Sequence, residues 1–281
     1  MMSLIQEQRI FFLGAGSMAE AMIKGLLEAG LVSAERMTIS NRQRPARLQD
    51  LQNVYGVGVS HDKLADVAQA DILLVAVKPF DLVTALREIA PAITSRHLII
   101  SVAAGVATEM IEQCIEVYAP VVRAMPNTSS FVQASATALC RGRWVTDEQV
   151  QTAQHLFSAI GTSLEVEEPL MNAVTGLSGT GPAYFYYLVE ALLEGGLGCG
   201  LPAETCNELL IQTMYGAAKM LQETRKEPAE LRRQVTSPNG TTMAAMQVLE
   251  QGEAHRLFIK AVQRATERAF EMGQQIATTN Q

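Results

Sequence analysis

A glycine-rich turn near the N-terminus is the first stretch whose residue types point to chemistry. Gly14-Ala15-Gly16-Ser17-Met18-Ala19 follows the apolar run Ile10–Leu13 and precedes a helical pattern. Gly14 permits a tight turn, and Gly16 leaves the backbone open to a pyrophosphate. Ala19 is small enough for close packing of the helix on the strand. Because helix N-termini bind phosphate, the pattern predicts a dinucleotide site; the alternative is a turn with a purely structural role.

The end of the expected second strand bears on the choice of cofactor. An NAD site usually places an acidic residue there, bonded to the ribose 2′-hydroxyl. This chain has Ser40-Asn41-Arg42-Gln43-Arg44 instead, with no carboxylate. Hydroxyl, amide and guanidinium groups suit a 2′-phosphate, so Asn41 and Arg42 predict NADPH, with NADH as the alternative. The competing interpretation is an ordinary solvated turn.

Three further turns follow strands and are expected at the same edge of the sheet. They are Ala76-Val77-Lys78-Pro79, Ala103-Ala104-Gly105 and Met125-Pro126-Asn127-Thr128. Ligands of open α/β sheets bind at the carboxyl ends of the strands, so the three turns should line one crevice. Lys78 is interpreted as a structural or cofactor-positioning residue rather than as a catalytic cation.

A second loop with ligand-binding groups lies far along the chain. Ser237-Pro238-Asn239-Gly240-Thr241-Thr242 leads into an expected helix. Its free amides and hydroxyls would capture a carboxylate without a basic side chain. The alternative is simple capping of the helix by Thr241 or Asn239.

Strands and helices alternate through the first half of the chain, in the rhythm of a doubly wound, Rossmann-type α/β fold. The run Asp71–Val77 is apolar after its first residue, as expected for a strand buried on both faces of a parallel sheet. No strand signal follows Pro169. The predicted domains are therefore a dinucleotide-binding domain over 1–168 and an all-helical dimerisation and substrate domain over 169–281. The expected strands are Ile10–Leu13, Met37–Ser40, Gly56–Val59, Asp71–Val77, His97–Ala103, Val121–Ala124, Ala136–Leu139 and Ser163–Val166.

The second half of the chain consists of expected helices rich in Ala, Leu and Gly. A bundle of this size would not bury all of its apolar surface by itself, which predicts association with a second copy. A compact monomeric bundle is the alternative. The expected helices are Pro182–Leu197, Pro202–Thr224, Pro228–Val235, Thr241–Gln251 and Glu253–Ile276.

Composition disfavours several classes of protein. The chain has 281 residues and a formal net charge of −7, which argues against a nucleic-acid partner. No uninterrupted apolar stretch is long enough to span a membrane, and the N-terminus does not read as a signal peptide. The four cysteines form no C-x-x-C pair and the histidines show no metal-ligand spacing. We therefore expect reduced thiols in the cytoplasm and no metal site.

Together these motifs resemble the pyrroline-5-carboxylate reductase family over nearly the whole chain. The most specific landmark is similar to the family signature Ser-Pro-Gly-Gly-x-Thr, with Asn239 where the first of those glycines is usual. Because Asn tolerates the left-handed conformation, the loop is expected to keep its shape. The landmarks are the N-terminal glycine loop, Ala76–Pro79, Ser101–Val106, Arg123–Thr128, Val174–Tyr184 and Leu231–Glu250.

The resemblance implies an oxidoreductase that reduces a cyclic imino acid, 1-pyrroline-5-carboxylate, to L-proline with NAD(P)H, the final step of proline biosynthesis. It also implies a homodimer through interlocked C-terminal helices, often assembled into a larger ring such as a decamer. Thr242 is the predicted catalytic residue, and Ser237, Gly240 and Thr241 bind the substrate with it. With the interpretation above, the predicted cofactor residues are Leu13, Gly14, Ala15, Gly16, Ser17, Met18, Asn41, Arg42, Ala76, Val77, Lys78, Pro79, Val102, Ala103, Ala104 and Asn127.

Two rival functions are weighed against this one. The 3-hydroxyacid dehydrogenases share the architecture but place a catalytic Lys and then an Asn after a second glycine motif, where this chain has Phe185 and Val189. Alcohol oxidation needs such a base and imine reduction does not, which favours the reductase. The other rival is a non-catalytic NADP-binding regulator, which the intact loop Ser237–Thr242 disfavours.

Overall fold

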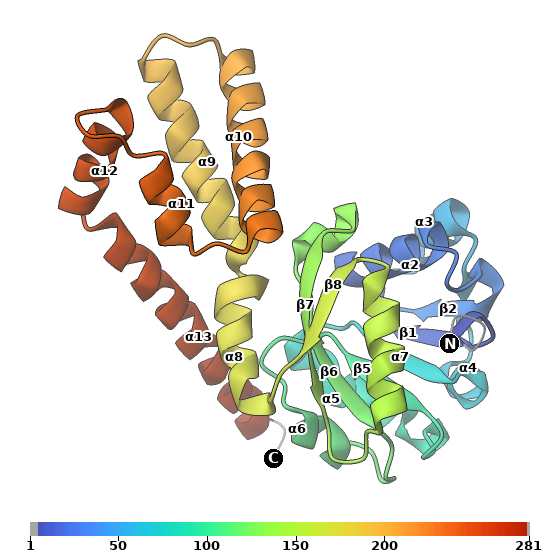
Figure 1. Ribbon diagram of the computed structural model, residues 1–281. Helices are drawn as coiled ribbons and strands as arrows, with labels where there is room; N and C mark the ends of the chain where they lie inside the picture. The colour runs from blue at the N-terminus through green and yellow to red at the C-terminus, as the bar shows by residue number, and fades with distance from the viewer. Residues whose placement is uncertain (1–4, 280–281) are drawn as a thin grey trace. The chain divides into compact units, whose positions relative to one another are not determined.

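The computed structural model describes residues 5–279 and divides into two compact units (Figure 1). One unit runs to Pro182 and includes the chain again from Gln263 onward. The other comprises Ala183–Val262. None of the helices in this described stretch combines the length and apolarity that a bilayer crossing requires.

The first unit is built on one eight-stranded sheet in the order β3-β2-β1-β4-β5-β6-β7-β8. The strands from β1 to β6 pair in parallel, as the alternating pattern predicts. Strand β7 runs antiparallel to β6, and β8 pairs in parallel with β7, so the sheet is parallel only up to β6. The bounds are β1 (Ile10–Leu13), β2 (Met37–Ser40), β3 (Gly58–Val59), β4 (Ile72–Val75), β5 (Leu98–Ser101), β6 (Val121–Met125), β7 (Ser135–Arg141) and β8 (Gly161–Glu165).

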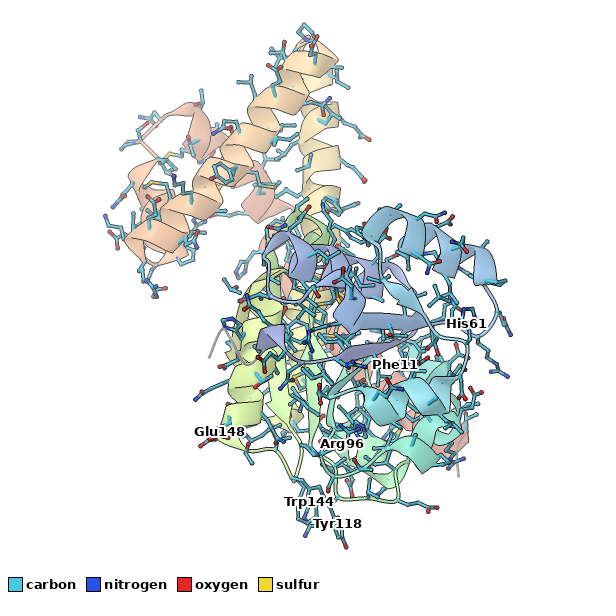
Figure 2. The ribbon with its side chains drawn as sticks, turned by 90° about the vertical axis from the view of Figure 1, so that its right-hand side faces the viewer. Phe11, His61, Arg96, Tyr118, Trp144 and Glu148 are labelled. Carbon is cyan, nitrogen blue, oxygen red and sulfur yellow. The ribbon has the colours of Figure 1, made fainter. Side chains whose placement is uncertain are left out.

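Helices cover both faces of this sheet, which explains the unbroken apolar runs of its central strands. Ile10 and Phe12 of β1 pack on the face covered by α2, α3 and α7. Phe11 and Leu13 pack on the face covered by α4, α5 and α6, and Phe11 lies inside the unit in Figure 2. The bounds are α2 (Ser17–Glu28), α3 (Pro45–Tyr55), α4 (Lys63–Gln69), α5 (Leu82–Ile89), α6 (Thr108–Gln113) and α7 (Asp147–Ser158).

Local sequence signals fix several helix ends in this unit. Thr146 and Gln149 form a capping box at the start of α7, and the Asp62 side chain accepts hydrogen bonds from the amides of the second and third residues of α4. Gly56 adopts a left-handed φ of +73° and ends α3. Pro79 opens a short 3₁₀ turn, and α5 begins directly after it, at Leu82.

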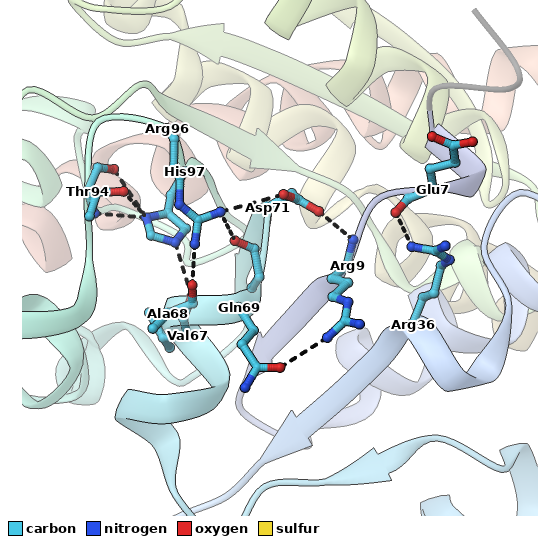
Figure 3. Close-up of polar contacts among 11 residues, drawn as sticks. Glu7, Arg9, Arg36, Val67, Ala68, Gln69, Asp71, Thr94, Arg96 and His97 are labelled. Atoms are coloured by element: carbon cyan, nitrogen blue, oxygen red, sulfur yellow. Dashed lines mark hydrogen bonds and ion pairs between the residues drawn. The ribbon is translucent and has the colours of Figure 1, made fainter.

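Polar side chains tie together the amino ends of the central strands, at the edge opposite their carboxyl ends (Figure 3). The backbone amide of Arg9 donates to Asp71, at 2.8 Å, and Arg96 donates to the carbonyl of Ala70, at 3.0 Å. His97 is fully buried, accepts at Nδ1 from the Thr94 amide and donates at Nε2 to a backbone carbonyl. Burial lowers the pKa of His97, so this histidine is a neutral structural residue.

An exposed aromatic pair lies at this same edge, beside the start of β6 and the end of β7. The ring centroids of Tyr118 and Trp144 are 4.8 Å apart (Figure 2). The guanidinium of Arg143 lies 5.0 Å from the Trp144 ring centroid, a cation–π distance. The two rings belong to the loop that precedes β6 and the loop that follows β7, so their contact joins these two loops.

A buried ion pair joins β6 to the segment after β8. Arg123 is 3% exposed, and its guanidinium lies 2.5 Å from Glu168. The same carboxylate accepts hydrogen bonds from the Thr108 hydroxyl, at 2.9 Å, and from the Cys140 thiol, at 3.2 Å. Burial raises the pKa of Glu168, but the charge of Arg123 and these hydrogen bonds outweigh it, so the pKa lies below its ordinary value.

The first compact unit extends beyond the boundary predicted between 168 and 169. Met171, in the short helix α8 (Met171–Val174), is fully buried and packs with Ala138 and Cys140 of β7. The chain then forms one wide turn over Thr175–Gly179 before the next helix begins. Because these contacts belong to the sheet, the unit ends at Pro182 rather than where the last strand ends.

The second unit is helical throughout, as expected, and leaves most of its apolar side chains exposed. Of residues 183–262, all of which are described, Cys206 alone is buried. A self-contained bundle would bury more, so the compact monomeric alternative does not fit. The bounds are α9 (Gly181–Gly198), α10 (Ala203–Thr224), α11 (Pro228–Gln234) and α12 (Thr241–Gln251). The large exposed side chains include Phe185, Tyr186, Tyr187, Leu188, Leu192, Leu209, Ile211, Tyr215, Val248 and Leu249.

The last helix, α13 (Ala254–Thr279), begins in the second unit and ends in the first. Its Ala269 and Ile276 are 4% and 0% exposed. Ile276 belongs to the core on the α5 and α6 face of the sheet. The C-terminal part of the chain is therefore a component of the sheet domain, which the sequence pattern did not predict.

Candidate functional site

A groove of about 250 Å³ opens at the carboxyl ends of β1, β2 and β4. Its walls come from the turns that follow these three strands, from the start of α4 and from α5 with the residue before it. This is the edge at which open α/β sheets bind ligands. The groove is lined by Leu13, Gly14, Ala15, Gly16, Ser40, Asn41, Arg42, Gln43, Arg44, Lys63, Ala76, Val77, Lys78, Asp81, Ala85 and Glu88.

Gly14 is required by the close approach of three strand ends. Its φ of +114° is rarely adopted by residues with a side chain, and a Cβ there would lie 2.6 Å from the carbonyl oxygen of Ala76. The Gly14 amide donates to the Ser40 carbonyl, at 3.0 Å, and the Ala76 amide donates to the Leu13 carbonyl, at 2.9 Å. These contacts fix the base of the groove.

The N-terminus of α2 has no side chain over its amides. Gly16 is the N-cap, and no side-chain hydrogen bond caps the helix. A Cβ at Gly16 would meet only the Ala76 oxygen, 3.8 Å away, and so would point into open space beside the groove. With the positive end of the helix dipole, this geometry suits a phosphate group.

Arg47 supports the glycine loop from α3. Its Nε donates to the carbonyl of Ala15, at 3.2 Å, and its other end pairs with Glu20 of α2. The hydroxyl of Tyr55 donates to the same Glu20 carboxylate, at 3.2 Å. The three side chains hold the loop against two helices.

Charged groups of both signs line the rest of the groove. Arg42 and Arg44 follow β2, where the sequence predicted an anion site. Lys63, at the start of α4, pairs with Glu88 of α5 at 2.8 Å. The hydrogen bond from Lys63 holds the pKa of Glu88 below its ordinary value, and Arg42 acts in the same direction.

Nine of the predicted cofactor residues line this groove, and seven do not. Val102 and Ala103 follow β5 at the next strand end, where the Val102 amide donates to the Val75 carbonyl, at 3.1 Å. The groove also includes Lys63, Asp81, Ala85 and Glu88, which the sequence analysis missed because they come from helices rather than from strand ends. The seven outside the lining are Ser17, Met18, Pro79, Val102, Ala103, Ala104 and Asn127.

Asn127 has its side chain bonded within the protein. Its Oδ1 accepts from the Ser129 amide, at 3.0 Å, and its Nδ2 donates to the Ser178 carbonyl, at 3.3 Å. Its backbone amide donates to the Ser135 hydroxyl, at 3.0 Å. Asn127 thus caps the turn after β6.

The second predicted site is the loop before α12, in the second unit. Gly240 is the N-cap of α12, and no side-chain hydrogen bond caps the helix. Capping by Thr241 or Asn239, the alternative interpretation, is therefore not found. Asn239 has a left-handed φ of +57°, as expected for a residue in place of glycine, and the Gly240 amide donates to the Ser237 carbonyl, at 3.1 Å.

Two family models match the chain. The model described as pyrroline-5-carboxylate reductase dimerisation matches residues 168–272. The model described as NADP oxidoreductase coenzyme F420-dependent matches residues 9–105, which include the glycine loop.

Curated relatives are similar over almost the whole chain. Pyrroline-5-carboxylate reductase 1 of Bacillus spizizenii is 38% identical over 280 residues, which cover 99% of this chain and 94% of the relative. The pyrroline-5-carboxylate reductase of Methanosarcina acetivorans is 41% identical, covering 96% of this chain and 99% of the relative.

Solved structures agree in fold. A pyrroline-5-carboxylate reductase from Coxiella burnetii has a TM-score of 0.86 and 37% identity, covering 94% of this chain and 98% of that one. The Plasmodium falciparum pyrroline carboxylate reductase with NADP bound has a TM-score of 0.86 and 25% identity, covering 96% and 99%.

Proposed function

This chain belongs to the pyrroline-5-carboxylate reductase family, and we propose that its groove binds the cofactor and its α12 loop binds the substrate. The activity is the NAD(P)H-dependent reduction of 1-pyrroline-5-carboxylate to L-proline, the final step of proline biosynthesis. One observation carries the division of roles: α2 and α12 both begin at a glycine N-cap without a side-chain cap. Each start leaves amides for an anion, the pyrophosphate at α2 and the substrate carboxylate at α12.

Thr242 is the proposed catalytic residue of the substrate loop. It is the second residue of α12 and is half-buried. In this proposal its hydroxyl hydrogen-bonds the ring nitrogen while the amides at the start of the helix hold the carboxylate. When bound, the reduced nicotinamide supplies a hydride to the imine carbon. The nitrogen also gains one proton, and Ser237–Thr242 contains no histidine or carboxylate to donate it. The imine therefore binds already protonated or takes the proton through Thr242 or water, and the loop acts mainly by positioning.

The lining of the proposed cofactor groove favours NADPH over NADH. Arg42, Arg44 and Lys63 bring three cations to a groove that has no carboxylate at the end of β2. A 2′-phosphate binds more strongly there than a 2′-hydroxyl, because a charged acceptor strengthens each hydrogen bond. NADH fits the same groove without that gain.

The assembly is proposed to be a homodimer through the helical unit, arranged in a larger ring such as a decamer, in the cytoplasm. The exposed apolar side chains of α9, α10 and α12 support the dimer, since a second copy would bury them. Mass measurement by light scattering after gel filtration tests both levels of assembly. A monomer would contradict the dimer, and a dimer alone would contradict the ring.

The direct test of function is oxidation of NADPH, followed by its absorbance, with and without pyrroline-5-carboxylate. We expect oxidation only when the imino acid is present, and slower oxidation with NADH. Constant absorbance at high protein concentration, with NADPH binding intact, would favour the non-catalytic regulator instead.

A further inference from the structure

We propose that the Lys63–Glu88 ion pair sets the preference between the two nicotinamide cofactors. When NADPH binds, Lys63 releases Glu88 and pairs with the 2′-phosphate, so Glu88 and the phosphate compete for the same ammonium group. This inference rests on the proposed cofactor groove. Neither residue lies in the turn after β2, where cofactor choice is usually encoded.

The topology brings Lys63 beside that turn. Strand β3 is the neighbour of β2 at the edge of the sheet, and Lys63 is the first residue of the helix that follows β3. Its side chain lines the same groove as Arg42 and Arg44. A phosphate held by the two arginines would therefore share its groove with a lysine ammonium.

Glu88 reaches the groove from another element. It lies near the end of α5, and its carboxylate accepts the Lys63 ammonium at 2.8 Å. Arg42, which follows β2, lines the same groove as Glu88, and its charge lowers the pKa of that carboxyl. Lys63, Glu88 and Arg42 thus form one electrostatic group.

The Lys63–Glu88 pair is suited to exchange partners. The two side chains are 31% and 40% exposed, and ion pairs with that exposure are weak. A phosphate monoester carries a charge of about −1.5 to −2 near neutral pH and offers three acceptor oxygens, against a single charge on Glu88. A lysine ammonium with three donors and a flexible stem moves between such acceptors readily.

The presence of Glu88 also explains how NADH remains usable. Without a 2′-phosphate, Lys63 stays neutralised by Glu88 and adds no unpaired ammonium to the groove. The carboxylate therefore lowers affinity for NADPH and leaves affinity for NADH nearly unchanged. Asp81, the other acid of the lining, has no ion pair with Lys63 among the described residues.

Binding measurements on Lys63→Gln and Glu88→Gln test the proposal. Titration calorimetry with NADPH, NADH, adenosine 2′,5′-bisphosphate and AMP separates the contribution of the 2′-phosphate to affinity from that of the rest of the cofactor. We expect Lys63→Gln to raise the Kd of NADPH and of the bisphosphate about tenfold to a hundredfold, with NADH and AMP unchanged. Glu88→Gln should lower the Kd of the two ligands that carry a 2′-phosphate, NADPH and the bisphosphate, about two- to fivefold.

Lys24→Gln is the matched control, because Lys24 forms a partly exposed pair with Glu28 in the same unit but outside the groove lining. It should change none of the four constants. Equal losses for NADPH and NADH in Lys63→Gln, or no loss for either, would overturn the inference while leaving the proposed function intact. If the wild-type protein bound neither cofactor, the proposed groove itself would be wrong.

Discussion

Gly273 of α13 lies against the carbonyl of Gly105 with no room for a side chain. A Cβ at Gly273 would come 2.5 Å from that oxygen, and a Cβ at Gly105 would come 3.1 Å from the carbonyl oxygen of Ala269. The helix backbone therefore packs directly on the loop after β5. That loop begins with Val102, Ala103 and Ala104, which are predicted to contact the cofactor. The end of α13 thus fixes the position of this loop.

The substitution Gly273→Ala should displace the loop that follows β5. Overpacking of this kind costs about 1–3 kcal/mol of stability, and a loop displaced by about 1 Å costs up to a hundredfold in rate. We expect a lower Tm and a fall in kcat at saturating NADPH. Gln274→Ala, one residue along on the exposed side of the same helix, is the control and should change neither. Wild-type kcat and Tm in Gly273→Ala would contradict the positioning role.

Gly14 and Gly16 should respond differently to substitution. Gly14→Ala puts a side chain on a residue with φ +114° and against Ala76, so it should lower the free energy of unfolding by about 1–3 kcal/mol. Gly16→Ala has an ordinary φ of −77° and open space, so the fold should be unaffected. Its methyl group would meet the pyrophosphate instead, and the Kd of NADPH should rise roughly tenfold or more. Urea unfolding and cofactor titration separate the two effects, and equal stability losses would contradict this reading of the loop.

Glu168→Gln should destabilise the protein in a pH-dependent way. The substitution leaves Arg123 buried without its counter-charge, which costs about 3 kcal/mol. The folded-state pKa of Glu168 lies below its ordinary value, so the pair stabilises the fold at pH values above the unfolded pKa. This contribution is lost as the pH falls through the folded-state pKa. The difference in unfolding free energy between wild type and variant should therefore be constant at pH values above the unfolded pKa and shrink below it. A difference that does not shrink there would contradict the ion pair.

Thr242→Ala should slow the reaction through loss of one hydrogen bond. A loss of about 1–3 kcal/mol corresponds to roughly a tenfold to hundredfold fall in kcat/KM for the imino acid. Thr242→Ser keeps the hydroxyl and should restore most of the rate. NADPH binding, measured by titration, should be unchanged in both. Undiminished turnover in Thr242→Ala would remove Thr242 from the mechanism.

Sequence patterns predicted elements whose signals are local. Strands β1 and β2 and helix α12 have the expected bounds, because a charged or polar residue or a glycine stands at each of their ends. The direction of β7 could not be predicted, since an apolar strand has the same pattern whether it pairs in parallel or antiparallel. The burial of Met171 and of Ile276 likewise depends on contacts between distant segments.

The residues of the candidate site likewise divide into those that local sequence signals predict and those that depend on contacts between distant segments. Gly14, Asn41 and Ala76 were found because turns after strands converge at one edge of a parallel sheet. Lys63 and Glu88 were missed, because their pairing joins two helices and leaves no spacing signal in the chain.

The return of α13 to the sheet domain has a consequence for synthesis on the ribosome. All eight strands have been synthesised once Glu165 is added to the chain, yet the core on one face of the sheet is complete only with Ile276. At about 5–20 residues per second, roughly 5–20 s separate the two events. Through that interval the nascent sheet domain carries an unfilled apolar site, the kind of surface on which chaperones act and aggregation begins. A truncation after Pro182 would make this transient state permanent, so we expect the sheet domain to be more stable when its final helix is retained.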